Sequence, residues 1–124
     1  MKSDKFKIIV IIKKFVLELD NILVRFPNKE KVLKDRLKSS LYDIIEFIYN
    51  ANYLSLDINS NERILLQCKI LSKLSLIDFF FEEAYKKGYL TESLFHKEIN
   101  ILSDLTTKIK SWMLYEKSND KRNM

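Results

Sequence analysis

Apolar residues recur at spacings of three and four along most of this chain, which is the period of one face of an α-helix. Four such stripes follow one another and predict helices at about residues 4–25, 29–52, 61–87 and 92–115. The stripe of the first helix consists of Phe6, Ile9, Ile12, Val16, Leu19 and Leu23. The β-branched run Ile8–Ile12 is also compatible with a buried strand, but the rest of the chain offers no strand for it to pair with.

Short polar signals separate the predicted helices. The residue before a proline avoids the helical conformation, so Phe26 and Pro27 should end the first helix, and Asn28 should cap the second. Gly88 should end the third helix, because glycine adopts the left-handed conformation without strain. Thr91 should cap the fourth helix with its hydroxyl. Helices joined by so short a turn are expected to lie antiparallel.

A longer connection is expected between the second and third helices. Residues 50–61 are rich in Asn, Asp and Ser, which hydrogen-bond their own backbone in loops. The third helix should start near Asn59, with Glu62 as a partner in a capping box. This is the one predicted connection long enough to be mobile or functional. Residues 116–124 have no apolar period, so we expect them to form a flexible basic tail.

The composition agrees with a purely helical chain. A length of 124 residues is typical of one domain with a real core. The sequence has one glycine and one proline, too few for a β fold that needs turn residues every few positions. We therefore expect an all-α fold, an antiparallel up-down-up-down four-helix bundle that forms a single domain over residues 1–115.

Charge is unevenly placed along the chain. The net charge of +5 is the balance of +6 in residues 1–40, −4 in residues 41–107 and +3 in residues 108–124. In an up-down bundle the first helix begins at the end where the fourth one finishes, so the basic segments should gather at the ends of the bundle. Basic clusters of this kind favour contact with phosphates, although they are also compatible with scattered solubilising lysines. The candidate nucleic-acid-binding residues are Lys5, Lys7, Lys31, Lys34, Lys108, Lys110 and Arg122.

Two runs of consecutive apolar residues predict self-association. Neighbouring residues of a helix point about 100° apart, so one core-facing stripe cannot bury all of Phe79–Phe81 or all of Ile8–Ile12. A homo-oligomer would cover the remainder. The candidate interface residues are Phe79, Phe80 and Trp112. A loosely packed monomer is the alternative.

The residues needed for the common helical-bundle chemistries are missing. His96 is the only histidine, whereas a carboxylate-bridged di-iron bundle uses two. Cys68 is the only cysteine, which excludes a disulfide framework and a thiolate cluster, and its apolar neighbours predict a buried side chain. One glycine cannot build a phosphate-binding loop. We expect no catalysis, metal or cofactor, a surface position for His96, and a cytoplasmic protein, since Ile8–Ile12 is too short to be a signal peptide's core or a membrane span.

Several landmarks follow one another in a characteristic order. A Phe-Pro dipeptide, Phe26-Pro27, precedes the second predicted helix, and an Ala-Asn pair, Ala51-Asn52, ends it. Residues 79–91 combine a run of aromatics, an alanine, a glycine and a further aromatic before the Thr91 cap. Trp112 lies in the last turn of the fourth predicted helix.

In this order of landmarks the chain resembles a family of small bacterial four-helix-bundle proteins over about Phe6 to Trp112. The family comprises the accessory variability determinant (Avd) of diversity-generating retroelements and the proteins encoded in intervening sequences of 23S rRNA genes. The chain departs from the family pattern at Glu82, where an arginine is common, and at Thr106 and Lys110, which replace glycines.

The resemblance implies a homopentameric barrel without catalytic activity. An Avd-like protein would bind the retroelement's reverse transcriptase and its template RNA, or an RNA/DNA hybrid, and support mutagenic cDNA synthesis. Two other interpretations stay open: an intervening-sequence protein of unsettled role, and a purely protein-binding helical adaptor whose lysines only confer solubility.

Overall fold

The computed structural model describes the backbone of residues 2–119 and the side chains of residues 7–55 and 57–118. The chain forms α1 (Lys2–Leu23), a short 3-10 helix η1 (Asn28–Glu30), α2 (Lys31–Tyr53), α3 (Leu56–Lys86) and α4 (Glu92–Asn119). No strand occurs in this part of the chain. The predicted all-α class is therefore confirmed.

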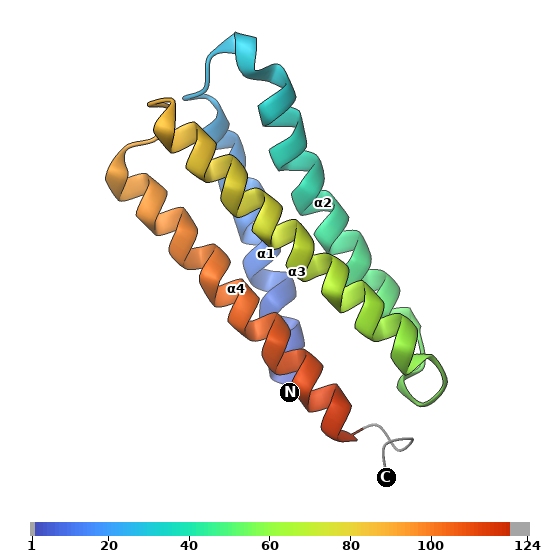
Figure 1. Cartoon of the computed structure of the whole chain (residues 1–124). Coiled ribbons are helices and arrows are strands. Elements are labelled where there is room, and N and C mark those ends of the chain that lie inside the picture. Colours follow the sequence, from blue (N-terminus) through green and yellow to red (C-terminus); the bar gives the residue numbers. More distant parts are fainter. Residues whose placement is uncertain (1, 120–124) are drawn as a thin grey trace.

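The four helices pack around a common core. Each helix contacts the next one in sequence, and α4 also packs against α1, which closes the ring. The α1–α2 and α3–α4 connections lie at one end of the bundle (Figure 1). The α2–α3 connection and the N-terminus lie at the other end, beside the last turns of α4. The first turns of α1 and the last turns of α4 thus lie in the same half of the bundle.

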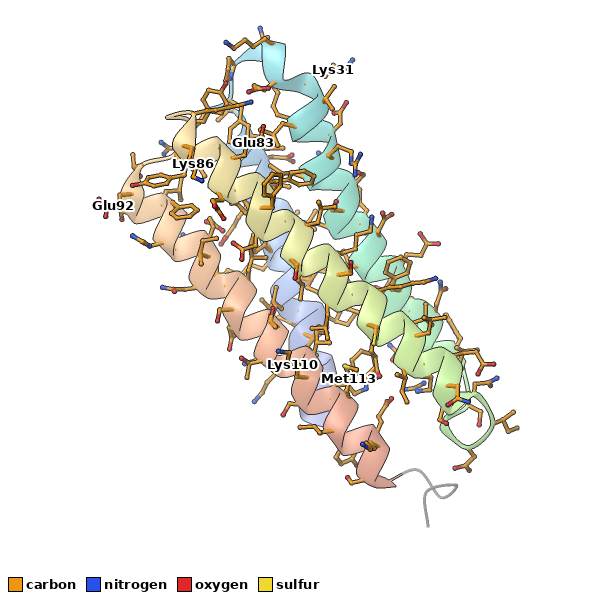
Figure 2. All side chains as sticks on the ribbon, in the orientation of Figure 1. Lys31, Glu83, Lys86, Glu92, Lys110 and Met113 are labelled. Atoms are coloured by element: carbon orange, nitrogen blue, oxygen red, sulfur yellow. The ribbon has the colours of Figure 1, made fainter. Side chains whose placement is uncertain are left out.

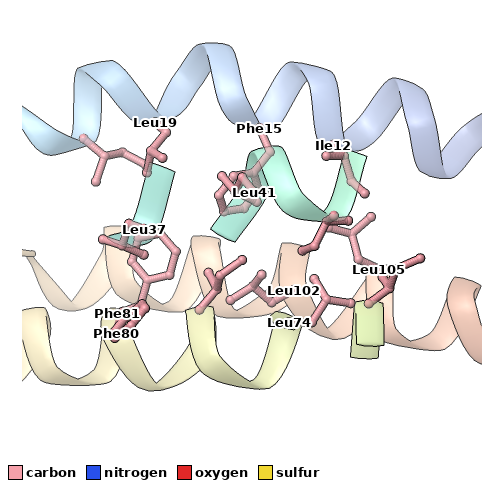
Figure 3. Packing of buried hydrophobic residues seen from close by; sticks show 14 of the residues in the cluster. Ile12, Phe15, Leu19, Leu37, Leu41, Leu74, Phe80, Phe81, Leu102 and Leu105 are labelled. Atoms are coloured by element: carbon pink, nitrogen blue, oxygen red, sulfur yellow. The ribbon is translucent and has the colours of Figure 1, made fainter. Parts of the chain in front are cut away.

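The core is built from long aliphatic side chains with a few aromatic ones. Figure 3 shows side chains of all four helices meeting at the centre of the bundle. The rings of Phe15 on α1 and Phe81 on α3 meet edge to face, with centroids 6.0 Å apart. The fully buried members of the core include Ile8, Ile12, Leu19, Leu37, Leu41, Ile44, Ile48, Ile70 and Ile77.

The predicted core stripe of α1 is partly wrong. Ile8 and Phe15 are buried, whereas Ile9 and Val16, which we expected in the core, are only half-buried. Apolar residues occupy both sets of positions, so spacing alone could not decide which phase of the helix faces inward. The side chain of Phe6 lies outside the described residues.

The turn between α3 and α4 agrees with the prediction. Gly88 has φ +82°, in the left-handed region. The Gly88 amide donates to the Tyr85 carbonyl (3.0 Å), and the Tyr89 amide donates to the Ala84 carbonyl (2.9 Å). This pair of bonds is a Schellman motif, which satisfies the last carbonyls of a helix. The Thr91 hydroxyl accepts the amide of the third residue after it at 3.2 Å, as expected of an N-cap.

The connection between α1 and α2 differs in detail from the prediction. The first helix ends at Leu23, and η1 intervenes before α2 begins at Lys31. No side-chain cap hydrogen bond is made at the start of η1 or of α2. Asn28 therefore starts the 3-10 turn instead of capping α2. Pro27 has φ −68° and ψ 156°, the extended conformation that separates the two helices.

The long loop predicted between α2 and α3 is wrong. Only Leu54 and Ser55 separate the two helices, and α3 begins at Leu56 with a kink at Asn59 (φ −115°, ψ 27°). The Ser55 amide donates to Asn59 Oδ1 (3.2 Å), and the Asn59 amide donates to the Ser55 carbonyl (2.7 Å). The polar residues satisfy the backbone locally, as expected, but within a tight helical turn. The predicted start at Asn59 corresponds to the kink.

The flexible tail predicted from residue 116 is also wrong for its first part. Helix α4 continues to Asn119, and the side chain of Glu116 is buried. Arg63 of α3 forms a bidentate ion pair with Glu116. Its Nε donates to Oε1 at 3.1 Å, and its Nη2 donates to Oε2. Gln67 Nε2 donates to the same carboxylate at 2.9 Å, and Trp112 Nε1 does so at 2.6 Å. Residues 120–124 of the predicted tail lie outside the described residues.

The remaining donors of Arg63 connect this pair to α2. Its Nη1 group donates to the carbonyl of Ala51 and to that of Leu54 (2.7 Å). These carbonyls lie in the last turn of α2 and just after it, and the Ala51 carbonyl also accepts the Leu54 amide (3.2 Å). We call Arg63, Gln67, Trp112 and Glu116 the buried ion cluster. It joins α2, α3 and α4 at one end of the bundle.

Candidate nucleic-acid interface

The lysines proposed for phosphate contact lie in both halves of the bundle. Figure 2 shows Lys31 at one end and Lys110 in the other half, several turns before the end of α4. Lys7 and Lys110 are exposed in the half that contains the N-terminus, whereas Lys31 and Lys34 belong to the end that contains η1. The side chains of Lys5 and Arg122 lie outside the described residues. The candidates therefore form two separate groups and not one patch.

Lys108 is already engaged by another residue. Its ammonium lies 2.9 Å from Asp104 Oδ1, one turn earlier on α4, and its side chain is 25% exposed. This ion pair and partial burial make Lys108 a poorer phosphate ligand than Lys110, which is exposed on the same helix. The two lysines of α4 therefore offer fewer free positive charges to a phosphate than the sequence indicates.

The other group surrounds the connection from α1 to α2. Residues 25–34, which we call the basic turn, contain Arg25, Lys29, Lys31 and Lys34. The first three are exposed and Lys34 is half-buried. Among the described residues, none of these four side chains makes an ion pair. Their charges are available to an external anion.

Glu30, the single carboxylate of the basic turn, pairs with Lys87, a lysine outside that turn. Glu30 Oε2 accepts hydrogen bonds from the Tyr89 hydroxyl (2.7 Å) and from Lys87 Nζ (2.9 Å), both from the α3–α4 turn. The Tyr89 hydroxyl, followed by Lys87, lowers the pKa of Glu30 below its usual value. Glu30 thus remains ionised, and its ion pair is with Lys87, although the charge of Lys29 in the basic turn also lowers its pKa.

The same contacts hold the basic turn in place. Phe26 is buried, and its ring lies 5.4 Å from that of Tyr89. The Glu30 hydrogen bonds lie beside this aromatic contact, so the α1–α2 connection is fixed to the α3–α4 turn by both apolar and polar contacts. A loop fixed in this way presents its charges with little loss of conformational entropy when a ligand binds.

Two of the three interface candidates are buried within the chain. Trp112 is 1% exposed and donates its indole N–H to Glu116, and Phe80 is 9% exposed beneath the Arg36 guanidinium. Neither can contact a second copy unless the bundle rearranges, which corrects our assignment of these two. Phe79 is 58% exposed and is the one of the three that is free to pack against another surface.

The single histidine and the single cysteine of the sequence both lie on the surface. His96 is exposed, as expected, and lies 3.6 Å from Glu92. Cys68 is also exposed, which contradicts the predicted buried position, because it falls on the outward side of α3. Within the described residues no group of three or more His, Cys, Asp or Glu side chains is placed to hold a metal ion. None of the described helices is long and apolar enough to cross a membrane.

No family model, curated protein or solved structure matches this chain. The resemblance to the Avd and intervening-sequence proteins therefore depends on the order of landmarks in the sequence and stays a prediction.

Proposed function

We propose that this protein is a non-catalytic RNA-binding accessory protein whose basic turn contacts phosphates. The observation that supports the proposal is the basic turn itself. Four basic side chains lie within ten residues, and the one carboxylate among them is paired with Lys87 and Tyr89. Lysine and arginine that neutralise phosphates release condensed counterions, which drives binding without a need for sequence readout.

The family resemblance gives this proposal a biological setting. In it, the four helices form an antiparallel up-down-up-down bundle and five copies assemble into a barrel. The assembly acts in the cytoplasm, where it binds a retroelement reverse transcriptase and its template RNA and supports mutagenic cDNA synthesis. The exposed Phe79 is compatible with packing between copies or against the polymerase.

The test is a salt titration of RNA binding, measured by fluorescence anisotropy with a structured RNA. The variant Lys31→Glu/Lys34→Glu should bind more weakly, and its slope of log K against log salt should be shallower by about 0.7–0.9 for each phosphate that the variant no longer neutralises. The control is Lys13→Glu/Lys69→Glu, which changes the net charge equally, on side chains that lie over Tyr49 and Phe47. Equal weakening of RNA binding in both variants would show that only the net charge of the protein matters. Unaltered RNA binding in the Lys31→Glu/Lys34→Glu variant would show that the basic turn does not contact RNA.

A second pair of charge reversals compares the two ends of the bundle. Lys108→Glu/Lys110→Glu should weaken RNA binding less than the basic-turn variant, because Lys108 is paired with Asp104. Its thermal stability should change little, since surface ion pairs contribute about 0–1 kcal/mol. A larger drop in RNA affinity than in the basic-turn variant would move the interface to the other end.

Light scattering coupled to size exclusion, with and without RNA, addresses the assembly. A mass near five chains that increases with RNA supports the Avd-like role. A reverse transcriptase that co-purifies would separate this role from that of an intervening-sequence protein. A monomer that is indifferent to RNA would favour a protein-binding adaptor, with Phe79 as part of its docking surface.

A further inference from the structure

A groove runs along the outer seam between α1 and α4. Its larger part encloses about 570 Å³ and its smaller part about 230 Å³. Glu18 and Lys97 line both parts, so the two adjoin each other. The combined volume is within the range of sites that hold small organic molecules.

The larger part of the groove is mainly apolar. Its apolar lining consists of Val10, Ile11 and Phe15 from α1 and Ile101 from α4. Its polar lining consists of Lys14, Glu18, Lys97, Asn100 and Asp104. This surface suits the aliphatic or aromatic body of a ligand.

The smaller part contains a carboxylate without a partner. Glu98 lines it and is 1% exposed. No described donor lies within hydrogen-bonding distance of its Oε2 atom. Burial, with a further contribution from Glu18, raises the pKa of Glu98, while Lys97 lowers it. A buried carboxylate that lacks a donor is costly, so a native chain seldom keeps one without a reason.

The charges around Glu98 define which ligand would suit it. Glu18 supplies a second carboxylate at the junction of the two parts of the groove. Lys97 and Arg25 also line the smaller part, but both are exposed, and neither makes an ion pair with Glu98. A third carboxylate, Asp104, lines the larger part but is paired with Lys108, and no described group of three or more such side chains is placed to hold a metal ion. The carboxylates of Glu98 and Glu18 are sufficient for a single ammonium or guanidinium group, which donates several hydrogen bonds.

We propose that the α1–α4 groove binds a small organic cation with an apolar body. The ammonium or guanidinium group lies between the carboxylates of Glu98 and Glu18, and the apolar body lies along Val10, Ile11 and Phe15. This site adjoins the basic turn, since Arg25 belongs to both, but the cation would contact Glu98 and Glu18, whereas a phosphate would contact Lys31 and Lys34.

Three probes of one shape and different charge test the proposal by isothermal titration calorimetry. Benzylammonium is the cation, benzyl alcohol the neutral analogue and benzoate the anion. The wild-type chain should bind benzylammonium saturably at millimolar concentration and bind the alcohol and the anion about tenfold more weakly or not at all, because a charge-assisted hydrogen bond would be absent. If benzyl alcohol bound as tightly as benzylammonium, the groove would bind apolar molecules without selecting a cation, which would contradict the proposal. Absence of benzylammonium binding would overturn the proposal as well.

Matched glutamate variants locate the cation. Glu98→Gln keeps the shape of the side chain and removes its charge, and it should weaken benzylammonium binding by about tenfold or more. Glu92→Gln removes an exposed charge on the same helix and should bind as the wild type does. Full affinity in Glu98→Gln would show that the carboxylate does not hold the cation. RNA binding should be unchanged in both variants, so failure of this site and failure of the basic turn are distinguishable.

Discussion

Two buried carboxylates on α4 have opposite surroundings. Glu98 and Glu116 are separated by eighteen residues, which is five helical turns and about 27 Å, so both lie on the same side of the helix. Glu116 accepts hydrogen bonds from Arg63, Gln67 and Trp112. Glu98 Oε2 has no such donor among the described residues.

The difference comes from the helix that each carboxylate faces. Near Glu116, α3 brings a guanidinium and an amide into the core. Near Glu98, the groove between α4 and α1 adds another carboxylate, Glu18. Burial alone therefore does not say what a charged residue does. A paired carboxylate joins helices, whereas an unpaired one leaves a position for a donor from outside the chain.

Removal of Arg63 should have the largest effect on the free energy of unfolding. Arg63→Met leaves Glu116 buried without its ionic partner, which costs about 3–5 kcal/mol. Chemical denaturation monitored by circular dichroism measures the loss. The double variant Arg63→Met/Glu116→Leu should recover much of it, because the pair is then replaced by apolar groups. A single variant as stable as the wild type would mean that the buried ion cluster does not stabilise the bundle.

Removal of one neutral donor from the same cluster should cost less. Trp112→Phe keeps an aromatic ring in the core but deletes the N–H that donates to Glu116. Hydrogen bonds to charged groups contribute about 1.5–3 kcal/mol, and loss of ring volume adds to this. The same substitution in a Glu116→Leu background separates the two effects by a double-mutant cycle. Additive effects would show that the indole contributes only through packing.

The pH dependence of stability should reveal Glu98. Its folded-state pKa is raised, so the stability that its protonated form contributes is complete below the ordinary glutamate pKa of 4.5 and is lost as pH rises through the folded-state pKa. The wild type should therefore become less stable relative to Glu98→Gln as pH rises from about 4 to 7. Asp78 also has a raised pKa but is present in both chains, so it cancels in the difference. Parallel melting-temperature curves for the two proteins would contradict the assignment.

A surface ion pair should show the smallest effect. Lys38 and Asp20 are 2.8 Å apart but both side chains are substantially exposed. Lys38→Met should cost less than about 1 kcal/mol, and salt should remove what effect there is. A loss comparable with that of Arg63→Met would mean that burial is not what distinguishes the ion pairs of this chain.

The sequence predicted the helices and the α3–α4 turn because each depends on local signals. Gly88 and Thr91 determine their own turn, and apolar spacing identifies a helix without any knowledge of its neighbours. The inward phase of α1 and the exposure of Cys68 could not be predicted in this way. Both depend on which neighbouring helix covers each face.

The buried ion cluster was missed although a signal for it is present. Arg63 and Gln67 precede Ile70 at core spacing, and Glu116 follows Trp112 by one turn. Charged residues that fall on an apolar stripe indicate a buried pair, but one chain does not show which residues are partners. For the candidate interface, the sequence shows only where lysines concentrate along the chain, and their role in phosphate contact stays a prediction. The ion pair of Asp104 with Lys108 was missed, although the two residues are four apart on a predicted helix, a spacing that favours such a pair.

The most direct test compares Glu98→Gln with Glu116→Gln at neutral pH. Each substitution removes one negative charge from α4 and keeps the size of the side chain, so only the surroundings differ. The free energy of unfolding, measured by urea denaturation, should rise for Glu98→Gln, which no longer buries an unpaired charge, and should fall for Glu116→Gln, which leaves Arg63 unpaired. A change of the same sign in both variants would contradict the distinction between the two carboxylates.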